Sequence, residues 1–196
     1  MTHLERPCAL VTGAARGIGR AIALALSDVG LTVVVNDPPG STDLPETVAA
    51  IGRKGGHAKA LASDICSVES HKQFVEEAWD AFGGIDCLVN NARVSVKVRD
   101  DLLKVTPESY DQIMAVNLRG PFFLTQEVAH RMIDAKSSSF RSITISSINA
   151  EFVSVDRAEY CIPRAASLWW LNSSPCGSPS MALGLTRFGR VSFGHK

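Results

Sequence analysis

The segment Thr12–Gly19 constrains the fold of this chain more than any other part of its sequence. Three glycines, Gly13, Gly17 and Gly19, follow an apolar run at residues 8–11 and precede a helical run. A strand, a glycine-rich turn and a helix in this order are typical of a dinucleotide-binding unit. Gly13 is predicted to allow the tight turn, Gly17 a close approach of the backbone to a pyrophosphate, and Gly19 close packing of helix on strand.

Apolar β-rich runs alternate with helical runs along the first 168 residues. The predicted strands are residues 8–11, 31–35, 58–62, 85–89 and 141–146, and the predicted helices are residues 18–29, 46–53, 68–82, 107–135 and a helix that starts near residue 158. This alternation predicts an α/β fold, a Rossmann-like, doubly wound parallel sheet in three layers with helices on both faces.

Length, charge and cysteine usage narrow the class of protein. The 196 residues suggest one domain, and the net charge of zero gives no electrostatic reason to expect nucleic acid or an anionic membrane as a partner. No apolar run reaches the roughly 20 residues that span a bilayer, and the N-terminus has no signal-peptide pattern. The five scattered cysteines form no C-x-x-C pair, so neither a metal site nor a disulfide framework is predicted. We expect a cytoplasmic protein.

Asp37 ends the second predicted strand, 24 residues after Gly13. An acidic residue there can bind the adenosine ribose hydroxyls of a dinucleotide and would repel the 2′-phosphate of NADP. Asp37 therefore favours NAD, whereas Arg16 in the glycine loop could attract a phosphate and keeps NADP open as an alternative. Asp37 could also be only a turn residue before Pro38.

Several further motifs resemble the short-chain dehydrogenase/reductase family. They are the glycine loop, Ala62-Ser63-Asp64-Ile65, Asn90-Asn91-Ala92, Asn117 with the residues that follow it, and Ser147 and Tyr160, which stand 13 positions apart. The likeness covers residues 8–167. The sequence is similar to members known as 3-ketoacyl-carrier-protein reductases.

The resemblance implies a hydride transfer between a nicotinamide cofactor and a small carbonyl or alcohol substrate. It implies that Tyr160 is the general acid/base, that Ser147 polarises the substrate oxygen, and that Asn117 holds a water of a proton relay. Arg164 takes the place of the family's lysine. The implied cofactor contacts are Gly13, Arg16, Gly17, Ile18, Gly19, Asp37, Asp64, Ile65, Asn90 and Ala92. Taken singly, Ser147, Asn117 and Tyr160 could instead be a helix-approach residue, a helix polar group and an interface aromatic.

Three positions depart from the family pattern. Arg164 keeps the positive charge of the expected lysine, but it is larger, planar and does not release its proton readily. Pro163 falls inside the predicted last helix, where it removes an N–H and can clash with the carbonyl four residues earlier. Arg93 stands where the family has glycine, so its side chain is expected close to the path of the cofactor.

The sequence changes character after about Ser167. Residues 169–196 are predicted to be a separate, poorly ordered tail after a dinucleotide-binding domain at residues 1–168, and the family's later strands and substrate lid are not found there. Read one base out of phase, residues 176–191 can encode strings that the family shows at the end of this helix and at its Pro-Gly turn. We hypothesise a one-base deletion between the codons of Leu168 and Trp169. An alternative function is thus open: a C-terminally truncated, inactive remnant that at most binds a dinucleotide or a partner subunit. Relatives form homo-oligomers, and the altered last helix puts that interface in doubt here.

Overall fold

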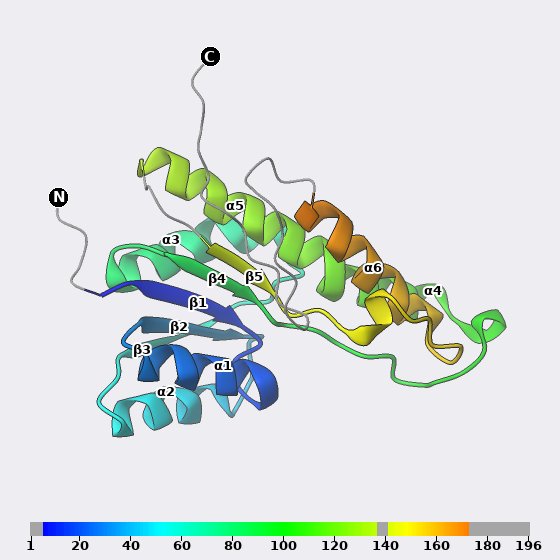
Figure 1. Ribbon diagram of the computed structural model, residues 1–196, viewed down its shortest axis with the longest axis horizontal. Helices are drawn as coiled ribbons and strands as arrows, with labels where there is room; N and C mark the ends of the chain where they lie inside the picture. The colour runs from blue at the N-terminus through cyan, green and yellow to red at the C-terminus, as the bar shows by residue number, and fades with distance from the viewer. Residues whose placement is uncertain (1–5, 137–140, 173–196) are drawn as a thin grey trace, which may run out of the picture.

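Five parallel strands form a single sheet at the centre of the computed structural model, which describes residues 6–136 and 141–172, with side chains as far as residue 167 (Figure 1). The strands are β1 (Cys8–Thr12), β2 (Thr32–Asp37), β3 (Ala58–Ala62), β4 (Cys87–Asn90) and β5 (Arg141–Thr144). Their order in the sheet is β3-β2-β1-β4-β5, and every adjacent pair is parallel. The predicted parallel α/β sheet is confirmed.

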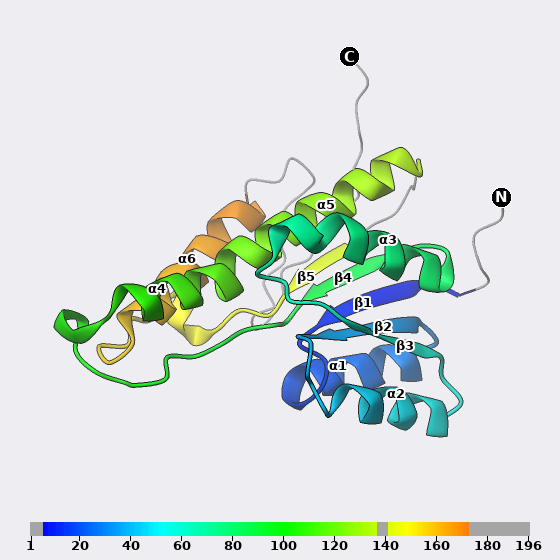
Figure 2. The same cartoon turned by 180° about the vertical axis from the view of Figure 1, so that it is seen from behind.

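Helices cover both faces of the sheet. The α-helices of the described residues are α1 (Gly17–Asp28), α2 (Leu44–Arg53), α3 (His71–Phe82), α4 (Pro107–Met114), α5 (Gly120–Asp134) and α6 (Ala158–Asn172). Helices α1 and α2 lie on one face, and α3 and α5 lie on the other, as the front and rear views show (Figures 1 and 2). The helix predicted over residues 107–135 consists of α4, a π-helical turn at Ala115–Arg119 and α5.

The alternation of side chains along β1 explains the two layers of the core. All five residues of β1 are buried, as is expected for a central parallel strand. Leu10 faces the helices α3 and α5 and packs with Leu88 and Leu124, whereas Val11 belongs to the cluster on the side of α1 and α2. Because successive side chains of a strand point to opposite faces, one short run of apolar residues supplies both clusters.

Helix α6 lies beyond the carboxyl ends of the strands, where it packs against α4 (Figure 1). It begins at Ala158, so Pro163 lies inside it, as predicted, and cannot donate a hydrogen bond to the carbonyl of Glu159. The Ser167 hydroxyl donates to the carbonyl oxygen of Pro163 at 2.6 Å. The helix continues past residue 168 to Asn172, and residues 173–196 of the predicted tail lie outside the described part of the chain.

Within residues 6–136 and 141–172, none of the helices combines the length and the apolar character that crossing a lipid bilayer requires.

Candidate functional site

The glycine loop between β1 and α1 has the local geometry that its sequence predicts. Gly13 has a φ of +64°, in the left-handed region, and a Cβ there would lie 2.8 Å from the Cα of Ala92. A Cβ at Gly19 would overlap the carbonyl oxygen of Gly13 and the side-chain amide of Asn91. Gly17 also has a positive φ, +58°, but it faces open space. Packing therefore requires glycine at Gly13 and Gly19, whereas a Cβ at Gly17 would meet no other atom within 4 Å.

A cleft of about 920 Å³ opens beside this loop. Among the residues that line it are eight of the predicted cofactor contacts: Gly13, Arg16, Ile18, Gly19, Asp37, Asp64, Ile65 and Ala92. Segment 38–43, which follows β2, forms another part of its wall, as do Gln112 of α4 and Ala115 and Val116 of the π-helical turn. The cleft therefore lies at the carboxyl ends of the strands, where open α/β sheets bind their ligands.

Asn91, and not the predicted cofactor contact Asn90, lines the cleft. Asn90 is buried and donates to the hydroxyl of Thr125 in α5 at 2.9 Å, away from the cleft. Asn91 lines the cleft, and its side-chain amide donates to the carbonyls of Thr12 (2.9 Å) and Gly13 (3.0 Å). The Thr12 hydroxyl in turn accepts from the backbone N–H groups of Asn91 and Ala92, both at 3.1 Å. Neither Thr12 nor Asn91 was predicted as a site residue, although both stand within the recognised motifs.

Two acidic side chains stand at the β2 and β3 end of the cleft. The carboxylate of Asp37 is half-buried and has no hydrogen-bond or ion-pair partner among the described residues. Asp64 accepts a hydrogen bond from the backbone N–H of Cys66 at 2.9 Å. Burial, together with the negative charge of Asp64, raises the pKa of the Cys66 thiol to about 11. Cys66 also lines the cleft and is therefore a protonated thiol at neutral pH.

Asn117 lies in the π-helical turn and is buried. Its Oδ1 accepts from the backbone N–H of Val94, and its Nδ2 donates to the carbonyl of the same residue, both at 2.9 Å. The side chain thus fixes the chain just after β4, a structural role that the sequence did not indicate.

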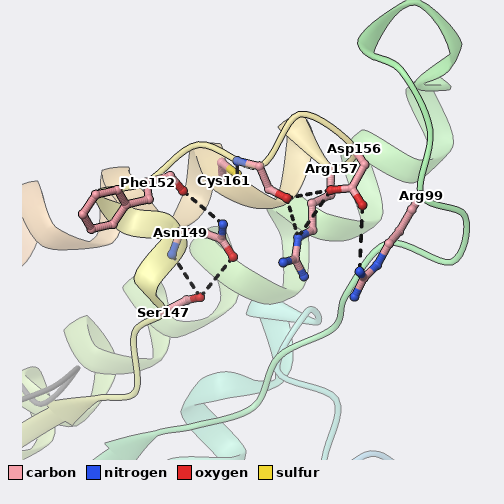
Figure 3. A network of polar contacts seen from close by, with 8 residues as sticks. Arg99, Ser147, Asn149, Phe152, Asp156, Arg157 and Cys161 are labelled. Carbon is pink, nitrogen blue, oxygen red and sulfur yellow. Dashed lines mark hydrogen bonds and ion pairs between the residues drawn. The ribbon is translucent and has the colours of Figure 1, made fainter.

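Ser147 follows β5 and begins a 3₁₀ turn, Ile148–Ala150. Its Oγ accepts from the backbone N–H of Asn149 at 3.2 Å and donates to the side-chain Oδ1 of Asn149 at 3.4 Å (Figure 3). Asn149 also donates to the carbonyl of Phe152 at 3.0 Å. Hydrogen bonds within its own turn therefore hold the Ser147 hydroxyl. The residue is half-buried.

A polar cluster ties the segment before α6 to the loop after β4 (Figure 3). The carboxylate of Asp156 accepts from the Ser154 hydroxyl at 2.6 Å and pairs with Arg99 at 3.8 Å. The hydrogen bond from Ser154 is the main cause of the lowered pKa of Asp156. The backbone N–H of Ser154 donates to the Cys161 sulfur at 3.4 Å, and Arg157 donates to the Ser154 hydroxyl at 3.1 Å.

Tyr160 and Arg164 lie side by side, one turn apart on α6. Both are buried, and the guanidinium carbon is 5.0 Å from the centre of the Tyr160 ring. Arg164 donates from Nη1 to the carbonyl of Ile145 at 3.2 Å, whereas Nε and Nη2 have no hydrogen-bond partner among the described residues. Burial lowers the pKa of Arg164, the nearby Tyr160 side chain partly offsets this lowering, and the positive charge of Arg93 adds to it.

The structure thus gathers the predicted residues into two groups. The predicted cofactor contacts line the cleft, except Asn90 and Gly17. Asn90 donates to Thr125 of α5, and Gly17 is exposed. Tyr160, Arg164 and Ser147 belong to α6 and to the turn that packs on it, and in the described part of the chain no polar contact joins Ser147 to Tyr160. The same described ranges contain no group of three or more His, Cys, Asp or Glu side chains placed to hold a metal ion.

Comparison with known proteins places the chain in a family. Residues 7–168 match the family model described as short chain dehydrogenase. A 3-oxoacyl-[acyl-carrier-protein] reductase of Synechocystis sp. is 38% identical over 166 residues, which are 84% of this chain and 65% of that protein. The chain therefore spans about two thirds of the length of this relative.

Solved structures agree with the sequence relatives. A 3-oxoacyl-[acyl-carrier protein] reductase from Brucella melitensis in complex with NAD is 39% identical, with a TM-score of 0.81 over 86% of this chain and 66% of that chain. A metagenomic short-chain oxidoreductase in complex with NADP is 33% identical, with a TM-score of 0.78 over 85% of this chain and 74% of that chain. The glycine loop, the parallel sheet and these likenesses lead to one conclusion: the chain belongs to the short chain dehydrogenase family.

Proposed function

We propose that this chain is an NAD(P)-dependent oxidoreductase that transfers a hydride between a nicotinamide cofactor and a carbonyl or alcohol carbon, with NAD preferred. One observation carries the proposal: a single cleft is lined by the glycine loop and Asp37, and its wall continues through Arg93 and Val94. The Brucella relative, which was solved with NAD, supports the choice of cofactor.

The residues around the cleft fit a dinucleotide. Gly17 leaves open the space that a Cβ would fill, so the start of α1 presents its N–H groups to an anion without a side chain in the way. The Asp37 carboxylate has no competing partner among the described residues and is free to accept hydrogen bonds from ribose hydroxyls. When bound, the nicotinamide supplies the hydride.

Tyr160 is the proposed acid in the direction of reduction. Its hydroxyl gives a proton to the substrate oxygen as the carbonyl carbon receives the hydride, and it takes the proton back in the reverse reaction. Arg164 holds its positive charge beside the Tyr160 ring while that proton is transferred. Ser147 donates to the same substrate oxygen after releasing Asn149. We propose a 3-oxoacyl compound as substrate, following the names of the relatives.

A second candidate function is dinucleotide binding without turnover. It is favoured by Pro163 inside α6 and by the engagement of the Ser147 hydroxyl within its own turn. In that case the chain would keep its cofactor cleft, while the residues beyond the cleft would not assemble around a substrate.

Cofactor binding is the first test. The purified chain is titrated with NADH and NADPH while nicotinamide fluorescence is recorded, and saturable binding that favours NADH is expected. Asp37→Ala should shift the ratio of the two dissociation constants toward NADPH by about tenfold, since one charge repulsion is removed. Asp80→Ala removes an exposed carboxylate of α3 and should leave the ratio unchanged. No saturable binding by folded protein would refute both candidate functions.

Turnover separates the two candidates. Reduction of methyl acetoacetate is followed at the absorbance of NADH, and Tyr160→Phe should abolish it without weakening NADH binding. The chain has two tyrosines, so Tyr110→Phe, at an exposed position of α4, is the matched control and should retain the rate. NADH binding without reduction by the unmodified chain would select the second candidate.

A further inference from the structure

Arg93 is a cation without a counter-ion on the wall of the cleft. It follows β4, its side chain is exposed, and no carboxylate or carbonyl of the described residues pairs with it. The carboxylates that line the cleft, those of Asp37, Asp43 and Asp64, follow β2 and β3 instead. Because β1 lies between β2 and β4, Arg93 and these carboxylates occupy different parts of the cleft wall, and Arg16 lines the cleft from the glycine loop.

The backbone that carries Arg93 is held firmly. The next residue, Val94, is fixed through both its N–H and its carbonyl by the Asn117 side chain, at 2.9 Å each. Ala92, on the other side, donates to the Thr12 hydroxyl at 3.1 Å. Arg93 therefore projects from a rigid point, so that only its side chain has to be ordered when it binds a ligand.

Arg164 adds a second unbalanced positive charge near the same place. Arg164 is only 3% exposed, and two of its three guanidinium nitrogens lack an acceptor among the residues described. Its contacts are one carbonyl, that of Ile145, and the Tyr160 ring, so its charge is not neutralised by a carboxylate, and the positive charge of Arg93 disfavours it further. An anion bound at Arg93 would offset the repulsion between the two arginines, and carboxylate and phosphate oxygens match the donors of a guanidinium.

We propose that Arg93 binds an anionic oxygen group of the substrate, a carboxylate or a phosphate, at the β4 end of the cleft, and that the buried charge of Arg164 reinforces this binding. Gln112 of α4 lines the same cleft and offers a further N–H donor. The inference rests on the proposed oxidoreductase function and narrows its substrate class to 3-oxo compounds that carry a negative charge.

A pair of substrates with and without the charge tests the proposal. Acetoacetate and methyl acetoacetate share the 3-oxo group, and acetoacetate alone carries a carboxylate. The ratio of their kcat/KM values should fall by about tenfold or more in Arg93→Gln, through the acid alone, and Arg93→Lys should restore part of it. Lys97→Gln removes an exposed positive charge from the same loop and should leave the ratio unchanged. An unchanged ratio in Arg93→Gln would overturn the proposal.

Binding of a non-reactive dianion gives a second reading that needs no turnover. Malonate binding is measured calorimetrically on the chain alone and on the NADH-saturated chain, and both should weaken about tenfold in Arg93→Gln. Competition between malonate and NADH would assign Arg93 to the cofactor phosphates and overturn the substrate assignment. If NADH does not bind but malonate still depends on Arg93, the oxidoreductase function fails while the anion site stands. Equal malonate affinity in Arg93→Gln and the unmodified chain would refute the site itself.

Discussion

Replacement of Gly19 by alanine is the sharpest test of how the glycine loop is built. The added Cβ would overlap the carbonyl oxygen of Gly13 and the side-chain nitrogen of Asn91, and it would lie 2.8 Å from the carbonyl carbon of Gly13. Ordinary carbon contacts are about 3.5–4.0 Å, so either α1 or the loop has to move. That movement would also break the hydrogen bonds from Asn91 to Thr12 and Gly13, which are 2.9 and 3.0 Å long.

The cost can be added from its parts. Overpacking in a well-packed region costs about 1–3 kcal/mol, and each lost hydrogen bond costs about 0.5–1.5 kcal/mol. The higher helix propensity of alanine offsets about 1 kcal/mol of this destabilisation. We therefore expect the free energy of unfolding to fall by about 3 kcal/mol, a large share of the 5–15 kcal/mol typical of a domain. Dinucleotide binding should be lost as well, because Gly13 and Asn91 line the cleft.

The measurement is urea unfolding followed by far-UV circular dichroism, with two other glycines as controls. Gly52 lies in α2 and a Cβ there meets nothing within 4 Å, so Gly52→Ala should raise the free energy of unfolding by about 0.5–1 kcal/mol. Gly17→Ala has the same open space but a φ of +58°, and it should cost only about 1–2 kcal/mol, from backbone strain. If Gly19→Ala unfolds at the same urea concentration as the unmodified chain, the packing argument is wrong.

Three further predictions concern the hydroxyl of Thr47 and the thiols of three cysteines. Thr47→Val removes a hydroxyl that donates to two carbonyls of the glycine loop, at 3.1 Å each. The substitution should lower the free energy of unfolding by about 1–3 kcal/mol in the same urea assay. A change below about 0.5 kcal/mol would contradict this prediction. Cys66, with its pKa raised to about 11, should react with iodoacetamide at pH 8 about 100-fold more slowly than a thiol of pKa 9, and NADH should protect it further; fast, cofactor-independent labelling would disprove the placement. Burial raises the pKa of Cys8 and of Cys87 to about 11, so these thiols stay protonated when folded while unfolded thiols ionise near pH 9. The free energy of unfolding should therefore fall as pH rises from 9 to 11, and it should fall less in Cys87→Ala. A free energy of unfolding that does not change over this pH range would contradict the burial of the two thiols.

The cofactor half of the site could be predicted from the sequence because its signals are local. A glycine with positive φ, a buried apolar run and an acidic residue at a strand end each leave a mark within a few positions. The choice between Asn90 and Asn91 could not be made in this way. A strand predicts that two neighbouring side chains point to opposite faces, but it does not say which face meets the cleft. That depends on Thr125 of α5, 35 residues further along the chain, which accepts from Asn90.

The positions beyond the cleft depend on contacts that the sequence does not encode locally. The π-helical turn that turns Asn117 toward Val94 has no sequence signal of its own, because it is one extra residue in an otherwise helical run. Ser147 was predicted from the resemblance to the family, including its spacing to Tyr160, yet that resemblance does not reveal that its hydroxyl caps the turn beginning at Ile148. Side-chain hydrogen bonds of this kind form only after strand, turn and helix have come together.

The two halves of the site therefore tolerate substitution differently. Around the cleft, Gly13 and Gly19 are packed so closely that neither has room for a Cβ, so a change at either position disturbs the fold itself. Around α6 the same backbone can carry different side chains, since Arg164 fits beside Tyr160 without an acidic partner among the described residues. Two departures from the family pattern, Pro163 and Arg164, fall in this second half, whereas Arg93 lies on the wall of the cleft itself. Arg93, an exposed side chain on a firmly held backbone, is the residue to which we assign recognition of the substrate's charge.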